Sequence, residues 1–169
     1  MSVPTAIVLG SFQLARASSL HRLIRAARTG DPTAIGTVVD RLGQAIGSIW
    51  PTITDGVLVP VPGHLPASDV PLVRIASSEI ATRRGWVYAE GALRRRRPAP
   101  AAKTGPVRDR CTEIESLRWI APERGQTIVL VDDVVRSGAT LRVCAEAIRA
   151  AGDRRQIVAI ALAAAIAED

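Results

Sequence analysis

Aromatic residues, cysteine and lysine are all scarce in this sequence. Aromatic side chains make up 3% of the 169 residues, whereas hydrophobic residues make up 47%. A core must therefore be built from Ala, Val, Ile and Leu, the usual filling between helices and a parallel sheet. The length suits one domain with a sizeable core. We expect a single α/β domain over residues 1–169.

Several common signals are also missing. No run reaches the roughly 18 apolar residues of a membrane span, and the N-terminus lacks the basic segment of a signal peptide. The two cysteines, Cys111 and Cys144, have neither the paired spacing nor the nearby histidines of a metal site. The phosphate loop GxxxxGK[ST] and the dinucleotide fingerprint GxGxxG are absent. We expect a cytoplasmic protein with reduced thiols and no membrane partner.

The charge is strongly basic. The 22 basic and 16 acidic residues give a net charge of +6, and Lys103 is the sole lysine among the basic residues. A positive chain suits an anionic partner, which could be nucleic acid, a phosphorylated metabolite or a membrane surface. Local motifs must separate these classes.

Apolar periodicity predicts alternating helices and strands. Helices are expected over residues 20–27, 32–50, 68–84 and 141–151, and strands over 6–9, 57–61, 86–89, 127–131 and 157–162. Residues 91–113 predict a flexible basic loop, since they hold four consecutive Arg and three Pro without periodicity. This order is typical of a right-handed parallel sheet with helices on both faces.

Residues 128–141, IVLVDDVVRSGATL, are the most informative stretch. An apolar strand delivers Asp132 and Asp133 to its C-terminal end, the edge where parallel sheets bind ligands. A small-residue loop then opens a helix, whose N–H groups can bind a phosphate together with the Ser137 and Thr140 hydroxyls. Gly138 would let the backbone approach the ligand closely.

Two carboxylates beside a phosphate site are compatible if they face hydroxyl groups. Each can accept a charge-assisted hydrogen bond from a ribose hydroxyl, contributing about 1.5 to 3 kcal/mol. A ribose 5-phosphate carries both features. The alternative is that Asp132 caps a helix, Asp133 is solvated, and Ser137 and Thr140 are ordinary capping residues.

The stretch resembles the motif that binds 5-phosphoribosyl 1-pyrophosphate (PRPP) in type I phosphoribosyltransferases, and it matches that motif at thirteen positions. The resemblance implies the parallel, Rossmann-like fold of that family. It implies that Asp132 and Asp133 contact the ribose hydroxyls. It also implies a 5-phosphate site formed by Arg136, Ser137, Gly138, Ala139 and Thr140.

A second segment, VLVPVPGH at residues 57–64, is similar to the family's first strand and pyrophosphate loop. By this resemblance Pro62, Gly63 and His64 bind pyrophosphate; the alternative is a Pro-Gly turn with a surface histidine. Residues 14–162 resemble the competence-protein-F branch of the family, and residues 1–50 would supply its hood. The chain departs from that branch because the four-cysteine zinc module and the Arg-Gly-Phe-Asn element are absent, and Lys103 stands near the position of a usual Gln.

The basic loop corresponds to the family's flexible catalytic loop. The resemblance implies that Lys103 and Arg110 close over the pyrophosphate and stabilise the charge that builds on it in the transition state. The alternative is that the Arg residues of this loop form a solvated surface.

The resemblance as a whole implies transfer of a phosphoribosyl group between PRPP and a nitrogenous base. Mg²⁺ would be held mainly by PRPP and water, near Asp132 and Asp133 but without direct protein ligands. A homodimer is expected, whereas the acceptor base and the direction of the reaction are left open. The rival hypothesis is a non-catalytic PRPP or nucleotide sensor linked to DNA uptake. It is disfavoured because no aromatic residues lie between the arginines of the basic loop to stack on bases.

Overall fold

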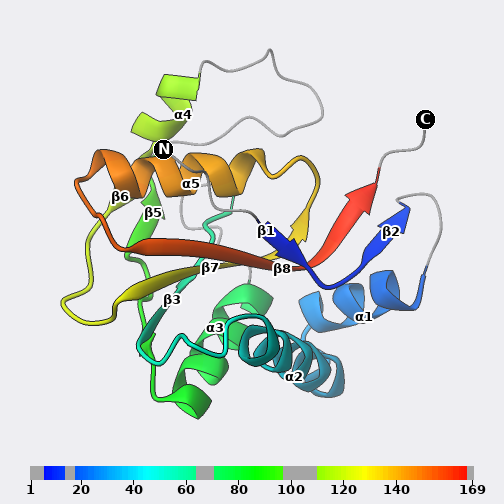
Figure 1. Ribbon diagram of the computed structural model, residues 1–169. Helices are drawn as coiled ribbons and strands as arrows, with labels where there is room; N and C mark the ends of the chain where they lie inside the picture. The colour runs from blue at the N-terminus through cyan, green and yellow to red at the C-terminus, as the bar shows by residue number, and fades with distance from the viewer. Residues whose placement is uncertain (1–5, 14–17, 64–70, 97–109, 167–169) are drawn as a thin grey trace.

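The structure is a computed structural model, and it describes residues 6–13, 18–63, 71–96 and 110–166. Its helices and strands alternate along the chain, as expected for an α/β protein (Figure 1). In chain order the elements are β1 (Ala6–Val8), β2 (Ser11–Gln13), α1 (Ser19–Arg28), α2 (Pro32–Ile49), β3 (Gly56–Pro60), α3 (Pro71–Arg84), β4 (Val87–Tyr88), β5 (Leu93–Arg95), α4 (Arg110–Glu115), β6 (Leu117–Trp119), β7 (Thr127–Val135), α5 (Ala139–Ala150) and β8 (Gln156–Ile166).

The main sheet is parallel throughout and has the order β1-β8-β7-β3-β4, with β2 also paired to β8. The predicted α/β class and parallel sheet are therefore confirmed. The strands β8, β7 and β3 lie in the interior of the sheet, and most of their residues are buried. Central parallel strands need such continuous apolar sequence because they have no solvent-facing side.

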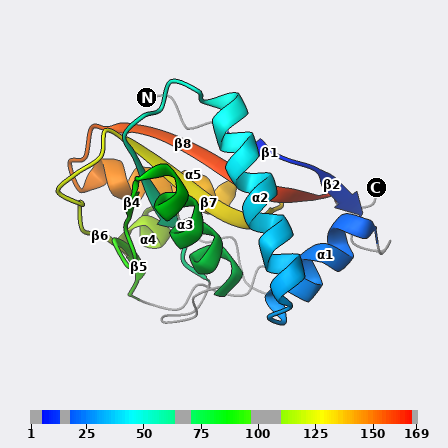
Figure 2. The ribbon, with the colours of Figure 1, turned by 90° about the horizontal axis from the view of Figure 1, so that it is seen from below.

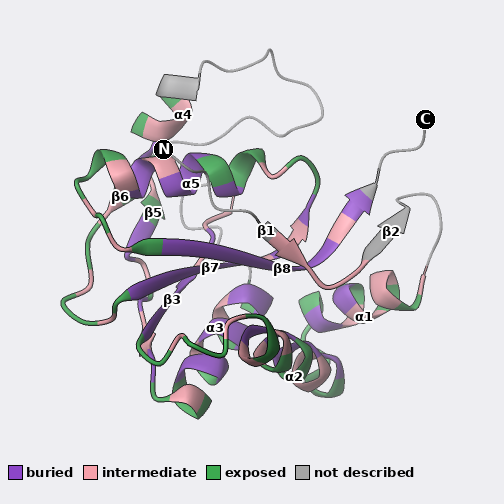
Figure 3. Cartoon of the chain, viewed as in Figure 1, coloured by how far each residue is buried: buried purple, intermediate pink, exposed green. Residues whose placement is uncertain are grey.

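Helices cover both faces of the sheet. One core cluster joins α1, α2 and α3 to one face, and a second joins α5 to the other. Figure 2, seen from below, shows α1, α2 and α3 in front of the sheet. Figure 3 shows that these helices bury the residues that face the strands and expose the opposite side to solvent.

The local signals that start the N-terminal helices are visible in the structure. The Ser18 hydroxyl accepts from the His21 N–H and begins α1, and the Asp31 carboxylate accepts from the Ala34 N–H at the start of α2. Such N-caps satisfy amide groups that the helix itself leaves unpaired. Both helices contribute to the core of the sheet, so the predicted N-terminal helical part packs within the domain.

The connections after β3 and β7 leave the sheet in opposite directions. The chain passes from β3 through α3 on one face to β4, and from β7 through α5 on the other face to β8. Because parallel crossovers are right-handed, moves to opposite sides place the two helices on opposite faces. The carboxyl ends of β3 and β7 therefore border a topological switch point, where open parallel sheets bind ligands.

Three features differ from the sequence prediction. β7 and β8 both run about four residues beyond the predicted strand ends, to Val135 and Ile166. β2 and β6 were not expected. β5 lies inside the predicted basic loop and pairs antiparallel with β6. Residues 110–113 of that loop belong to the helix α4, and residues 97–109 lie outside the described residues.

In the described part of the chain, no helix combines the length and the apolar character needed to cross a membrane.

Candidate functional site

The two predicted ligand-binding segments meet at the carboxyl edge of the sheet. In the register between β3 and β7, Pro60 is opposite Val131, and the Val61 N–H donates to the Val131 carbonyl at 2.9 Å. The backbone at Pro62 and Gly63 therefore lies beside the acidic pair that follows Val131. Segments about 70 residues apart in sequence are brought together by strand pairing alone.

The acidic pair lies within β7, not in the loop after it. Asp133 is 5% exposed and Asp132 is partly buried. The Asp132 Oδ1 atom accepts a hydrogen bond from the Asp133 N–H at 2.8 Å. The expectation that the pair marks the end of the strand is thus wrong by about three residues, because β8 continues to pair with β7 as far as Val135. The alternative in which Asp132 caps the following helix is also excluded, because Gly138 is the N-cap.

An arginine from α1 holds the second carboxylate. The Arg28 Nε and Nη2 atoms both lie 2.6 Å from the Asp133 Oδ2 atom, and the Arg28 side chain is 48% exposed. A buried carboxylate without such a partner would be costly. Sequence reasoning missed Arg28. The available signal was that a carboxylate in a buried strand needs a cation.

Burial raises the pKa of Asp132 to about 7, and the neighbouring charge of Asp133 adds to the rise. The Asp133 N–H and the positive charge of Arg28 oppose it but do not cancel it. One arginine therefore serves two adjacent carboxylates. Groups with strongly shifted pKa values are concentrated at functional sites, although structural networks shift them too.

Each carboxylate keeps one oxygen outside these contacts. Arg28 uses only Oδ2 of Asp133, and the Asp133 N–H uses only Oδ1 of Asp132. The two carboxylate side chains also interact with each other, and this interaction adds to the rise in the pKa of Asp132. A cation or hydroxyl group from a ligand at this pair would favour the ionised carboxylates.

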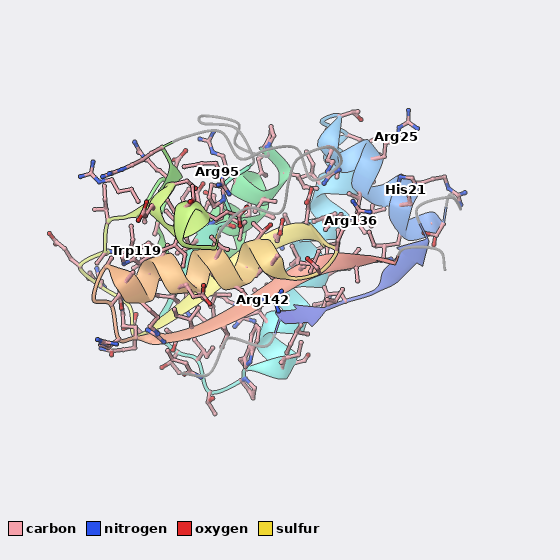
Figure 4. All side chains as sticks on the ribbon, turned by 90° about the horizontal axis from the view of Figure 1, so that it is seen from above. His21, Arg25, Arg95, Trp119, Arg136 and Arg142 are labelled. Carbon is pink, nitrogen blue, oxygen red and sulfur yellow. The ribbon has the colours of Figure 1, made fainter. Side chains whose placement is uncertain are left out.

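The loop between β7 and α5 exposes donors. Arg136, Ser137, Ala139 and Thr140 are all exposed, and Figure 4 shows Arg136 at the turn into α5. Gly138 has a φ of 70°, a left-handed conformation that glycine adopts without strain, and nothing lies within 4 Å of the position of an added Cβ. As the N-cap it offers no side chain to the first-turn N–H groups, and the Ser137 hydroxyl accepts a long hydrogen bond, of 3.4 Å, from the Ala139 N–H. These groups and the positive end of α5 suit an anion.

The Pro62–Gly63 turn is held by a second arginine that sequence reasoning did not single out. The Arg95 Nε atom donates to the Gly63 carbonyl at 3.0 Å, and Arg95 Nη1 donates to the Ser116 hydroxyl at 2.9 Å. Arg95 is the last residue of β5. In the sequence it stands within a run of four arginines, where no local signal distinguishes it from its neighbours.

Three predicted site residues cannot be placed. His64 and Lys103 lie outside the described residues. Arg110 begins α4, but its side chain is not described. Among the residues that are described, no group of three or more His, Cys, Asp or Glu side chains gathers as a metal site.

Two surface cavities lie away from this edge. One, of about 390 Å³, is lined by residues that include Leu20, Arg41 and Leu162, and the other, of about 490 Å³, by residues that include Asp40, Ile80 and Arg83. Neither contains a predicted site residue.

No protein-family model matches the chain, and no curated protein matches it.

Proposed function

We propose that this protein binds PRPP with Mg²⁺ as a type I phosphoribosyltransferase and exchanges the phosphoribosyl group between pyrophosphate and a nitrogenous base. One observation carries the proposal. The acidic pair, the open start of α5 and the Pro62–Gly63 turn all border the switch point between β3 and β7. A ligand that spans these groups must offer hydroxyls at its middle and phosphates at both ends.

PRPP has that chemistry. Its ribose hydroxyls would donate to the carboxylate oxygens of Asp132 and Asp133. Its 5-phosphate would accept from the N–H groups and hydroxyls of residues 137–140, with the positive charge of Arg136 close by in the chain. Its pyrophosphate would lie against the Pro62–Gly63 turn. We therefore propose that the α/β fold of this chain is the type I phosphoribosyltransferase fold.

Mg²⁺ fits the same site. It prefers oxygen ligands and keeps several waters, so the carboxylate oxygens of Asp132 and Asp133 would hold its water shell while PRPP supplies direct ligands. When bound, the ion neutralises charge on the leaving pyrophosphate. An ionised Asp132 accepts stronger, charge-assisted hydrogen bonds from hydroxyls, and a nearby cation favours that form over the protonated one.

The reaction needs no side-chain nucleophile. The bond between the ribose C1 and the pyrophosphate oxygen breaks, and a bond forms between C1 and a nitrogen of the base, which loses a proton. Catalysis then depends on positioning the two reactants and on stabilising the departing charge. We propose that Lys103 and Arg110 contribute to the second task.

Calorimetric titration with PRPP and MgCl₂ tests the proposal. The wild-type protein should bind PRPP, and Asp132→Asn should weaken binding by about 10- to 100-fold, because one hydrogen bond to a charged group is lost. Asp55→Asn removes an exposed carboxylate elsewhere and should leave affinity unchanged. A wild-type protein that does not bind PRPP would refute the proposal.

A pyrophosphate-release assay with a panel of purine and pyrimidine bases tests the transfer step. Release that depends on one base identifies the acceptor and supports the enzyme. Binding of PRPP without release by any base would favour the non-catalytic sensor instead.

A further inference from the structure

The side chain of Arg95 connects three separate segments of the chain. Its guanidinium donates to the carbonyl of Gly63, at the turn after β3, and to the hydroxyl of Ser116, between α4 and β6. Arg95 itself ends β5 and is partly buried. In Figure 4 Arg95 lies on the side of the molecule where α4 and the β5–β6 pair are found.

Ser116, one of the two partners of the Arg95 guanidinium, is itself held in place by hydrogen bonds. Ser116 is 3% exposed, and its hydroxyl donates to the Glu113 carbonyl at 2.6 Å. The Ser116 carbonyl accepts from the Arg96 N–H at 2.7 Å. Both the backbone after Arg95 and its guanidinium are therefore fixed to the same serine. The guanidinium reaches Gly63 from a rigid frame.

The contact with Gly63 restrains the backbone at the end of β3. Arg95 Nε holds the Gly63 carbonyl, and Gly63 also carries an N–H group of its own that can donate to an anion. The fork of guanidinium donors can hold a carbonyl and a hydroxyl at once, a geometry that the point charge of lysine does not reproduce.

We propose that Arg95 is a positioning residue that holds the Gly63 turn in the conformation that binds the pyrophosphate moiety of PRPP. This inference rests on the proposed function. Arg95 acts through the Gly63 carbonyl and Ser116, and its contribution is specific to the pyrophosphate end of the ligand. The 5-phosphate site at the start of α5 does not depend on it.

Titrating Arg95→Gln with three ligands tests this role. With MgCl₂ present, affinity for pyrophosphate and for PRPP should fall by about 10- to 100-fold, the loss expected when a hydrogen bond from a charged donor is removed. Affinity for ribose 5-phosphate should stay within about twofold. The matched control is Arg94→Gln, which removes the same charge one residue earlier from an arginine that donates to the Gly91 carbonyl.

Two further variants separate positioning from direct contact with the anion. Ser116→Ala frees one side of the Arg95 guanidinium without changing its charge, and it should also weaken pyrophosphate binding. Arg95→Lys should fail to restore that binding. If Ser116→Ala binds pyrophosphate normally and Arg95→Lys restores binding, Arg95 acts as a simple charge and the inference is wrong.

Other outcomes overturn the inference in distinct ways. Equal losses for pyrophosphate and ribose 5-phosphate in Arg95→Gln would mean that Arg95 only supports the fold, and unchanged affinity for both would mean that it has no role in binding. If the wild-type protein binds none of the three ligands, the proposed function itself fails, and this inference fails with it.

Discussion

The aspartates at the two ends of the parallel strands, here called the amino edge and the carboxyl edge of the sheet, have pKa shifts of opposite sign. At the amino edge, the side chain of Asp153 is 6% exposed and is paired with Arg155 at 2.5 Å, and it also accepts from Trp119 Nε1 at 3.0 Å. Hydrogen bonds from Arg155 lower the pKa of Asp153 to about 2. At the carboxyl edge, burial and the adjacent Asp133 raise the pKa of Asp132 to about 7.

The difference separates an acid whose charge is satisfied within the protein from one for which we propose a role in ligand binding. The amino edge is internally satisfied, because Arg155 Nη1 also lies within 3.2 to 3.3 Å of the carbonyls of Pro122, Arg124 and Gly125. Figure 4 places Trp119 beside the end of α5, close to this network. The carboxyl edge keeps two carboxylates for one arginine. A ligand that brings hydroxyl groups and a bound cation would reduce the repulsion between these two carboxylates.

The two pKa shifts predict opposite dependences of stability on pH. The low pKa of Asp153 stabilises the folded state above the ordinary value of 3.8, and this contribution is lost as the pH falls towards 2. The raised pKa of Asp132 means that the folded state binds more protons between about pH 4 and pH 7. Stability from this group therefore falls as the pH rises through that window.

The largest expected effect comes from breaking the amino edge. Arg155→Met leaves Asp153 buried without its cation and removes donors from the loop before β7. The free energy of unfolding at pH 7 should fall by about 3 to 5 kcal/mol, as for other broken buried ion pairs. Urea denaturation measures this. Arg154→Met, at the exposed neighbouring position, should change stability by less than about 0.5 kcal/mol, and equal effects of both changes would mean that the network is not structural.

A change at the carboxyl edge should act in the opposite direction. Asp132→Asn removes a carboxylate that is difficult to ionise, so it should raise the free energy of unfolding at pH 8 by roughly 2 to 4 kcal/mol. The gain should vanish below about pH 4, where Asp132 is protonated in both the folded and the unfolded state. Thermal unfolding across pH checks the sign, and loss of stability at pH 8 would contradict the pKa argument.

The smallest of the three expected changes in stability comes from replacing Arg28, the arginine beside Asp132 and Asp133. Arg28→Gln should cost about 1 to 2 kcal/mol of stability, since Arg28 is half-exposed but bonds a buried carboxylate. It should also raise the pKa of Asp132 further, because the charge of Arg28 lowers it. Carboxyl NMR titration measures this pKa. Arg25→Gln, at an exposed position one turn earlier in α1, is the control, and an unchanged Asp132 pKa in Arg28→Gln would show that the two groups are not coupled.

Most of the fold could be predicted from the sequence because the patterns that indicate its helices and strands are local. Apolar runs predicted β3, β7 and β8, and apolar periodicity predicted α1, α2, α3 and α5. Three short strands, β2, β5 and β6, were missed because their stability depends on partners distant in sequence, which periodicity does not reveal.

Only part of the candidate site could be predicted from the sequence, because its other residues depend on contacts between distant segments. The acidic pair and the glycine loop form one continuous motif, and a single sequence suffices to recognise them. Arg28 lies 105 residues from Asp133, and Arg95 lies 32 residues from Gly63. Nothing near either arginine in the sequence indicates its partner. Only the packing of α1 and of the β5–β6 pair on the sheet brings them to the site.

The pairing of β1 and β2 with β8 has a consequence for how the chain folds. β8 is long and rich in Ala and Ile, and without β1 and β2 one side of it would present unpaired amide and carbonyl groups, a template for association with other chains. Residues near the beginning of the chain can cover this strand only after the ribosome has made residues near its end. The nascent protein must therefore wait for β8 before its sheet is closed, and during that interval it should be most dependent on chaperones.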